Sequence, residues 1–212
     1  MELLSTILGQ LISVGAIALI IVFQPELRRF LQVIGMRQKH FNFITRIFST
    51  GDDTVQTNVV PIVTACREMS ETKTGALIVI GQQSDLRLIA EGGIALDAKV
   101  STSLLKNIFF KNAPLHDGAV LIEGDRIVAA KCILPVTQSD VPKSYGTRHR
   151  AAIGMSEISD AIIIVVSEET GGISIAQGGE LRRDIDPVRL QQTLQRYLTI
   201  NTRKRSKKEV AE

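Results

Sequence analysis

The hydrophobic pattern is densest at the start of the chain. No charged residue occurs from Leu3 to Phe23, and residues 14–23 are almost wholly apolar. A helix of this length crosses the hydrocarbon core of a bilayer, so we predict a transmembrane helix over residues 1–24. Four polar residues lower its hydropathy and leave a buried or interfacial helix as the alternative, namely Ser5, Thr6, Gln10 and Ser13.

Positive charges follow the apolar stretch. Residues 28–46 contain Arg28, Arg29, Arg37, Lys39 and Arg46. By the positive-inside rule, these charges place the rest of the chain in the cytoplasm. We therefore predict a cell-membrane protein with a juxtamembrane helix and linker over residues 25–53 and a cytoplasmic domain after it.

The pattern of residues 54–200 changes repeatedly between helical and strand periods. Apolar positions three and four apart predict helices, whereas short aliphatic runs bounded by glycine or polar turns predict strands. The expected helices cover residues 55–72, 100–110, 151–158 and 188–200. The expected strands cover residues 76–80, 86–90, 119–122, 126–135, 161–166 and 173–176. Hairpin signals connect several of these strands, so we predict a mixed α/β domain whose largely antiparallel central sheet is flanked by helices.

Composition narrows the function. Tryptophan is absent and aromatic residues make up 4% of the chain, so the core is aliphatic. The formal charge is +3, and much of the excess lies in residues 201–212, which we expect to be a disordered basic tail. The cysteines, Cys66 and Cys132, are too few for a disulfide framework. The chain also lacks the P-loop pattern and the common motifs of serine hydrolases and zinc proteases.

The strongest candidate for chemistry is the segment Gly-Thr-Arg-His-Arg at residues 146–150. Arginine presents a planar fork of donors that matches phosphate oxygens, and a threonine hydroxyl and backbone N–H groups add directional bonds. We expect this segment to lie near a helix N-terminus, which favours anions. Taken alone, the same residues also fit a solvated or nucleic-acid-facing patch.

Two further polar segments complete the candidate set. Residues 116–119 read His-Asp-Gly-Ala, in which the carboxylate is an acceptor for a cation or a sugar hydroxyl and the glycine lets backbone approach a ligand. Residues 167–172 read Ser-Glu-Glu-Thr-Gly-Gly after the strongest strand, and Glu169 offers a second carboxylate for a cation. Each segment is also compatible with an ordinary turn.

In their order and approximate spacing, the three segments resemble the motifs of the diadenylate cyclase (DAC) domain, and specifically its membrane-anchored CdaA-type members. The resemblance runs from about Phe23 to Leu198. It implies the DAC-domain fold over residues 54–200 and condensation of two ATP into cyclic di-AMP with release of two pyrophosphates. It also implies a requirement for Mg²⁺ or Mn²⁺ and an active homodimer in which two protomers face each other.

The resemblance also implies roles for single residues. Asp117 would orient or deprotonate the attacking 3′-hydroxyl or hold the metal, and Gly118 and Ala119 would present backbone to the nucleotide. Backbone near Leu134 would bind adenine. Phosphate contacts would come from Gly146, Thr147, Arg148, His149, Arg150 and Ser167, and further metal contacts from His116 and Glu169. Catalysis would rest on Asp117, Arg148, His149 and Arg150.

Two departures from the family pattern stand out. Relatives of the CdaA type commonly carry three membrane helices, whereas one apolar segment is visible here. Ile133 stands where many relatives place an aromatic residue beside the base, so stacking would be absent or supplied elsewhere. Two alternatives stay open, a membrane-tethered non-catalytic nucleotide sensor and a membrane-linked nucleic-acid binder. We expect no nucleic-acid partner, and the sequence identifies no regulatory protein.

Overall fold

The computed structural model describes residue 23, residues 58–142 and residues 144–209. The transmembrane helix expected over residues 1–24 and the juxtamembrane segment expected over residues 25–53 therefore lie outside the described residues, except for Phe23. Within the described ranges, no helix combines the length and apolar character needed to span a bilayer.

A seven-stranded sheet forms the centre of the domain. Its strands lie in the order β2-β4-β3-β1-β5-β6-β7. Among the described strands, β1 and β3 form the one parallel pair, and every other neighbouring pair is antiparallel. The bounds are β1 Ala76–Ile80, β2 Ile94–Lys99, β3 Ala119–Glu123, β4 Arg126–Cys132, β5 Ile162–Val166, β6 Ile173–Gln177 and β7 Glu180–Arg182. The mixed, largely antiparallel α/β class is confirmed.

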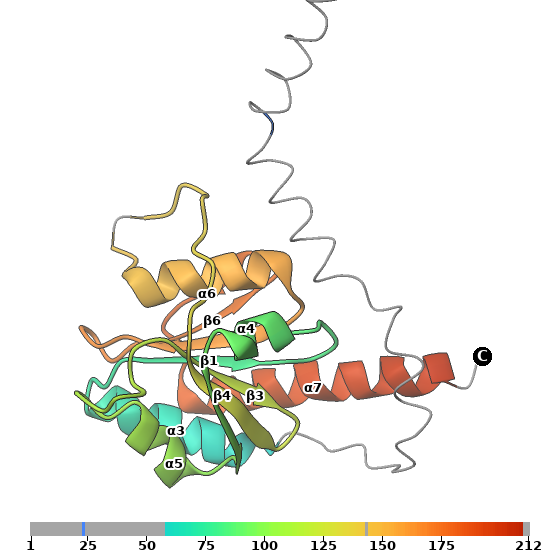
Figure 1. The fold of residues 1–212 in the computed structure, drawn as a ribbon, viewed down its shortest axis with the longest axis horizontal. Coiled ribbons are helices and arrows are strands. Elements are labelled where there is room, and N and C mark those ends of the chain that lie inside the picture. Colours follow the sequence, from blue (N-terminus) through green and yellow to red (C-terminus); the bar gives the residue numbers. More distant parts are fainter. Residues whose placement is uncertain (1–22, 24–57, 143, 210–212) are drawn as a thin grey trace, which may run out of the picture. The chain divides into compact units, whose positions relative to one another are not determined.

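Helices cover both faces of this sheet (Figure 1). On one face lie α3 (Val59–Glu71), α5 (Thr102–Ile108) and α7 (Pro187–Glu209), and on the other lie α4 (Arg87–Glu91) and α6 (Thr147–Ile158). Central strand β1 is buried at every position. Its residues alternate between the two cores, with Ile78 facing the three-helix layer and Val79 facing α4 and α6. The aliphatic core expected from the composition is thus split into two layers by the sheet.

Local signals explain where the helices begin. The side chain of Asn58 caps α3 by accepting a hydrogen bond from the backbone N–H of Val60 at 3.1 Å. Pro61 lies in the first turn, where its missing N–H breaks no helical bond. Ser101 caps α5 in the same way through Leu104 at 3.2 Å. Both predicted helices are therefore confirmed, with somewhat shorter bounds.

The strand predicted over residues 86–90 is wrong, because Leu86 is the N-cap residue of the helix α4, which spans Arg87–Glu91. Leu86 and Ile89 are three positions apart, and both are buried beneath the helix. Arg87 bonds Asp85 directly before the helix begins. β1 pairs with β3 and β5. The edge strands β2 and β7 were not predicted, because their exposed polar residues mask the strand pattern.

Two helix boundaries also differ from the prediction. α6 begins at Thr147, not at residue 151, so the basic segment forms its first turn. α7 continues through residues 201–209, where the sequence predicts a disordered tail. Lysine, arginine and glutamate are good helix formers and no proline or glycine interrupts this stretch, so nothing in the local sequence ends the helix.

Candidate active site

The three candidate motifs meet where the central strands begin or end. We call this side of the sheet, which is formed by strand ends and not by an outer strand, the sheet edge. Parallel pairing of β1 with β3 places Gly75 and Gly118, which precede these strands, at the same edge. Because β5 runs antiparallel to β1 and pairs Val166 with Ala76, Ser167 emerges at this edge as well. β4 ends there too, since Cys132 pairs with Ala119. Segments far apart in the sequence thus line one continuous edge.

The first turn of α6 presents free backbone donors at this edge. Gly146 occupies the cap position and no side chain caps the helix. Thr147 follows as the first helical residue and is exposed, whereas the N–H of Arg150 bonds the carbonyl of Gly146 at 3.2 Å. Uncapped N–H groups and the helix dipole attract anions. The expected proximity of this segment to a helix N-terminus is therefore confirmed.

Arg148 is held by a glutamate that the sequence analysis did not select. Its Nη1 donates to Oε2 of Glu168 at 2.8 Å. The guanidinium lies against Gly75, where an added β-carbon would come within 2.6 Å of the same Nη1. The Arg148 side chain is only 21% exposed, against 63% for Glu168. Glu168 and Gly75 therefore fix the position of this arginine.

His149 is nearly buried and uncharged at neutral pH. Its ring lies 5.8 Å from the ring of Tyr145, centroid to centroid, and Arg183 stacks over Tyr145 at 5.3 Å. Burial lowers the pKa of His149, and the positive charge of Arg183 lowers it further, whereas Glu169 and Asp184 oppose the shift. His149 thus offers a neutral imidazole to a ligand, and the positive charge of the motif rests on its two arginines.

The acidic loop after β5 is tied down at both ends. The Ser167 hydroxyl accepts hydrogen bonds from the N–H groups of Glu169 and Thr170 at 3.3 and 3.2 Å. Gly171 has a φ of 78°, and its carbonyl accepts a hydrogen bond from Ser70 of α3 at 2.5 Å. The Ser167 hydroxyl therefore organises the loop, and Glu169 remains exposed on it.

Backbone at the Asp-Gly-Ala motif packs tightly against β4. Gly118 has a φ of 120°, and a β-carbon there would lie 2.9 Å from the carbonyl oxygen of Cys132. This position requires glycine. The Nδ1 of His116 lies 2.6 Å from the carbonyl oxygen of Ala113. Because a carbonyl only accepts, Nδ1 carries the proton, and Nε2 keeps the lone pair that a metal ligand needs. Asp117 is exposed.

No complete metal site exists among the described side chains. Residues 58–142 and 144–198 contain no group of three or more histidine, cysteine, aspartate or glutamate residues that could hold an ion. His116, Asp117 and Glu169 therefore do not form a closed site within one protomer. The exposed carboxylates of Asp117 and Glu169 are oxygen donors of the type that hard cations such as Mg²⁺ take.

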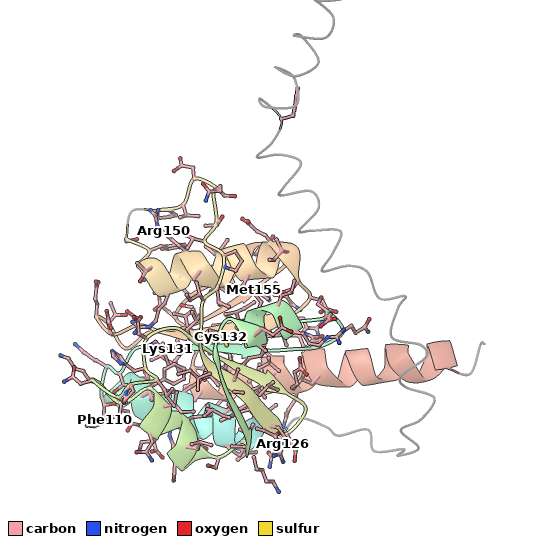
Figure 2. The ribbon with its side chains drawn as sticks, in the orientation of Figure 1. Phe110, Arg126, Lys131, Cys132, Arg150 and Met155 are labelled. Carbon is pink, nitrogen blue, oxygen red and sulfur yellow. The ribbon has the colours of Figure 1, made fainter. Side chains whose placement is uncertain are left out.

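The segment expected to bind adenine leaves β4 and crosses to α6. Leu134 is buried, whereas Ile133 is 80% exposed. Cys132 and Met155 belong to the same core cluster, which joins the end of β4 to α6 (Figure 2). The Thr137 N–H bonds the carbonyl of Arg150 at 3.2 Å. This bond links α6 directly to the segment after β4.

Sequence reasoning missed several residues of this site. Gly75, Tyr145, Glu168 and Arg183 all contact or support the motif helix. Glu168 adjoins the selected Glu169, and Tyr145 adjoins Gly146, so proximity in sequence was the available signal for both.

The two cysteines take no part in the site. Burial raises the pKa of Cys66 to about 12 and that of Cys132 to about 11, which keeps both thiols protonated.

Comparison with known proteins identifies the family. The family model described as DisA bacterial checkpoint controller nucleotide-binding matches residues 63–181. The cyclic di-AMP synthase CdaA of Bacillus subtilis is 42% identical over 201 residues, which are 94% of this chain and 72% of that protein. A diadenylate cyclase of Listeria monocytogenes is 44% identical over 200 residues, with the same coverage of 94% and 72%.

Solved structures agree with this assignment. The crystal structure of a DacA double mutant from Staphylococcus aureus has a TM-score of 0.64 and 45% identity, and covers 65% of this chain and 93% of that one. A protein of Bacillus cereus described as a hypothetical membrane spanning protein has a TM-score of 0.60 and 39% identity, with coverage of 79% and 80%. The sheet edge, its three motifs and these similarities lead to one conclusion: the chain belongs to the diadenylate cyclase family of nucleotidyltransferases.

Proposed function

We propose that this protein condenses two ATP molecules into cyclic di-AMP and releases two pyrophosphates. The supporting observation is the assembly of three distant motifs at one sheet edge, with Arg148 between Gly75 and the acidic loop. A nucleotide bound along this edge would contact hydrogen-bond donors for its phosphates, the carboxylate of Asp117 and the segment near Leu134. The names of the relatives point to the same reaction.

The phosphates bind at the first turn of α6. Thr147 supplies a hydroxyl, the uncapped N–H groups supply backbone donors, and Arg148 and Arg150 supply positive charge. Because Glu168 holds Arg148 in advance, this guanidinium needs no reorganisation when charge develops on the leaving pyrophosphate. Adenine lies against the backbone near Leu134, beyond the end of β4. Positioning and charge stabilisation supply most of the catalysis in phosphoryl chemistry.

The reaction forms two phosphodiester bonds. Each 3′-hydroxyl oxygen attacks the α-phosphorus of the other ATP, the bond from that phosphorus to the β-phosphate oxygen breaks, and pyrophosphate leaves with the electron pair. The hydroxyl proton passes to the Asp117 carboxylate or through it to water. Gly118 and Ala119 hold the backbone close to the nucleotide, which places the carboxylate beside the ribose.

A divalent cation, Mg²⁺ or Mn²⁺, completes the site. Glu169 and His116 are its protein ligands in this proposal, with Asp117 as a further oxygen donor. The free Nε2 of His116 and the exposed carboxylate of Glu169 support this assignment. When bound, such a cation would supply positive charge beside the phosphates and so ease attack by another oxygen.

Two protomers are needed because each binds one ATP and supplies one attacking hydroxyl. A symmetric pair with the two sheet edges facing each other presents each 3′-hydroxyl to the opposite α-phosphate. We also propose that residues 1–24 anchor the chain in the cell membrane and leave the catalytic domain in the cytoplasm, where ATP is found. Their apolar pattern and the basic residues after them support this anchor.

Incubation of the purified chain with ATP and Mg²⁺ or Mn²⁺ tests the proposal. Mass spectrometry should detect cyclic di-AMP, and the Asp117→Asn variant should make at least a hundredfold less, a loss typical of a proton-transfer group. Asp125→Asn, in the turn between β3 and β4, is the matched control and should retain activity. ATP that binds tightly but stays unreacted in the wild type would instead identify a nucleotide sensor.

A further inference from the structure

Lys73 has a backbone conformation that normally favours glycine. It follows α3 with a φ of 52°, in the left-handed region. Its N–H bonds the carbonyl of Ser70 at 3.1 Å, and the N–H of Thr74 bonds the carbonyl of Met69 at 2.8 Å. These two bonds define a Schellman motif, in which the left-handed position is most often glycine and sometimes asparagine. A lysine at this position therefore lowers the stability of the domain.

No ion pair compensates for this cost. The Lys73 side chain is exposed. Within the part of the chain that the structure describes, no carboxylate forms an ion pair with Lys73, although ion pairs hold Lys106 and Arg148. A residue that strains the backbone and has no charged partner is a candidate for a functional role.

The turn that carries Lys73 touches both charged parts of the active site. A β-carbon on Gly171 would lie 3.6 Å from Cγ of Lys73, so the lysine stem runs along the acidic loop. Two residues further on, Gly75 lies against the guanidinium of Arg148. Ser70, at the start of the same motif, holds the carbonyl of Gly171. The stem of the Lys73 side chain therefore starts beside the acidic loop.

The order of the strands shows which part of ATP reaches this point. Adenine is assigned to the end of β4, and the acidic loop follows β5. In the order β4-β3-β1-β5, these two places are three strand spacings apart, or about 14 Å. An extended nucleoside triphosphate spans such a distance. Its terminal phosphates would then lie beside the turn that carries Lys73.

We propose that Lys73 binds the β- and γ-phosphates of ATP, which leave together as pyrophosphate. This assignment rests on the proposed function and adds a substrate contact outside the three motifs. A lysine ammonium is a compact point charge that suits phosphate oxygens lying at the rim of a site. The left-handed backbone of Lys73 sets the start of its stem beside Gly171, at the end of the acidic loop.

The test compares Lys73→Gly, Lys73→Met and Lys73→Arg in the full chain. Lys73→Gly relieves the left-handed backbone and should raise Tm by about 2–4 °C. The same variant should raise the KM for ATP about tenfold to a hundredfold, the usual effect of losing a charged hydrogen bond. A gain in Tm together with a loss of affinity excludes unfolding as the cause. Lys73→Arg should retain most of the affinity.

Inhibitors identify which part of the nucleotide Lys73 contacts. In Lys73→Met, inhibition by inorganic pyrophosphate should weaken by the same factor as the KM for ATP, whereas inhibition by AMP should stay within about twofold of wild type. Asn112→Gly is the matched control, because Asn112 also has a positive φ, of 69°, outside the motifs. It should raise Tm and leave the KM for ATP unchanged.

Three outcomes would overturn the assignment. The first is a Lys73→Gly variant that gains stability and keeps the wild-type KM. The second is a Lys73→Met variant that weakens AMP and pyrophosphate equally. The third is a Lys73→Arg variant as weak as Lys73→Met. In each case a wild type that makes cyclic di-AMP leaves the proposed function intact, whereas a wild type without product contradicts that function itself.

Discussion

Arg148 and Glu168 form an ion pair with 2.8 Å between Nη1 and Oε2, and the pair rests on the backbone of Gly75. It joins the first turn of α6 to the loop after β5. Because the Arg148 side chain is only 21% exposed, the surrounding residues and this ion pair together restrict the movement of its guanidinium. In the proposed function, this pair sets the position of the charge that the triphosphate meets at the sheet edge.

Substitution of Glu168 should therefore affect activity more than stability. Since Glu168 is largely exposed, Glu168→Gln should change the free energy of unfolding by at most about 1 kcal/mol. Turnover should fall about tenfold to a hundredfold, because the guanidinium loses its alignment. Urea unfolding and a product assay measure the two effects. Glu180→Gln, an exposed glutamate on β7, is the control, and equal turnover in both variants would refute this role.

Gly75→Ala should displace Arg148 while the fold persists. The new β-carbon would lie 2.6 Å from Nη1, and the end of a long side chain moves more easily than backbone. We expect turnover to fall at least tenfold, with a circular dichroism spectrum like that of the wild type. Gly92→Ala is the matched control, because its nearest contact would be an ordinary 3.6 Å. Wild-type turnover in Gly75→Ala would contradict the placement of Arg148.

His149 should make the domain less stable in mild acid. Because burial and Arg183 lower its pKa in the folded state, the unfolded chain binds a proton first as pH falls. The stability contributed by the neutral imidazole is complete above the unfolded pKa of about 6.5 and is lost as pH falls below it toward the lower folded value. Urea unfolding between pH 8 and pH 5 measures this loss, and His149→Gln should show a shallower decline. Parallel declines would exclude His149 as the source.

Removal of residues 1–24 should release the protein from the membrane and leave its activity largely unchanged. The truncated chain should move from the membrane fraction to the soluble fraction, because the apolar stretch is its predicted anchor. Cyclic di-AMP formation per protein should remain within a few-fold of the full chain, since all three motifs lie after residue 115. Sedimentation of lysates and a product assay test both points. A truncated chain that still sediments with membranes would argue against the anchor.

The sequence predicted the central strands well, because their signals are local. β1 and β5 are unbroken aliphatic runs, and both are buried at every position. α4 was mistaken for a strand because residues 86–90 are too few to separate the two periods. Four of the six residues of β2 are exposed and its pairing with β4 shifts register between Ala95 and Ala98, so this strand depends on tertiary contacts that a linear pattern does not contain.

The motifs themselves were predictable, whereas the contacts that position them were not. The sequence analysis selected Arg148 for its chemistry. Its partner Glu168 lies in the loop after β5, and this contact appears only in the folded chain. Gly75 has no motif of its own, and its importance follows only from the approach of Arg148. Lys73 resembles any surface lysine in the sequence, and only its positive φ distinguishes it. Such relationships arise when the sheet order brings distant segments to one edge.

The most direct test of the central claim uses mixed pairs of one wild-type protomer and one Asp117→Asn protomer, isolated through two different tags. If two facing protomers each supply one attacking hydroxyl, such pairs form only one phosphodiester bond and release one pyrophosphate. Mass spectrometry should then detect a linear dinucleotide and almost no cyclic di-AMP. Cyclic di-AMP at half the wild-type rate, without the linear product, would contradict the claim, because each protomer would then act alone.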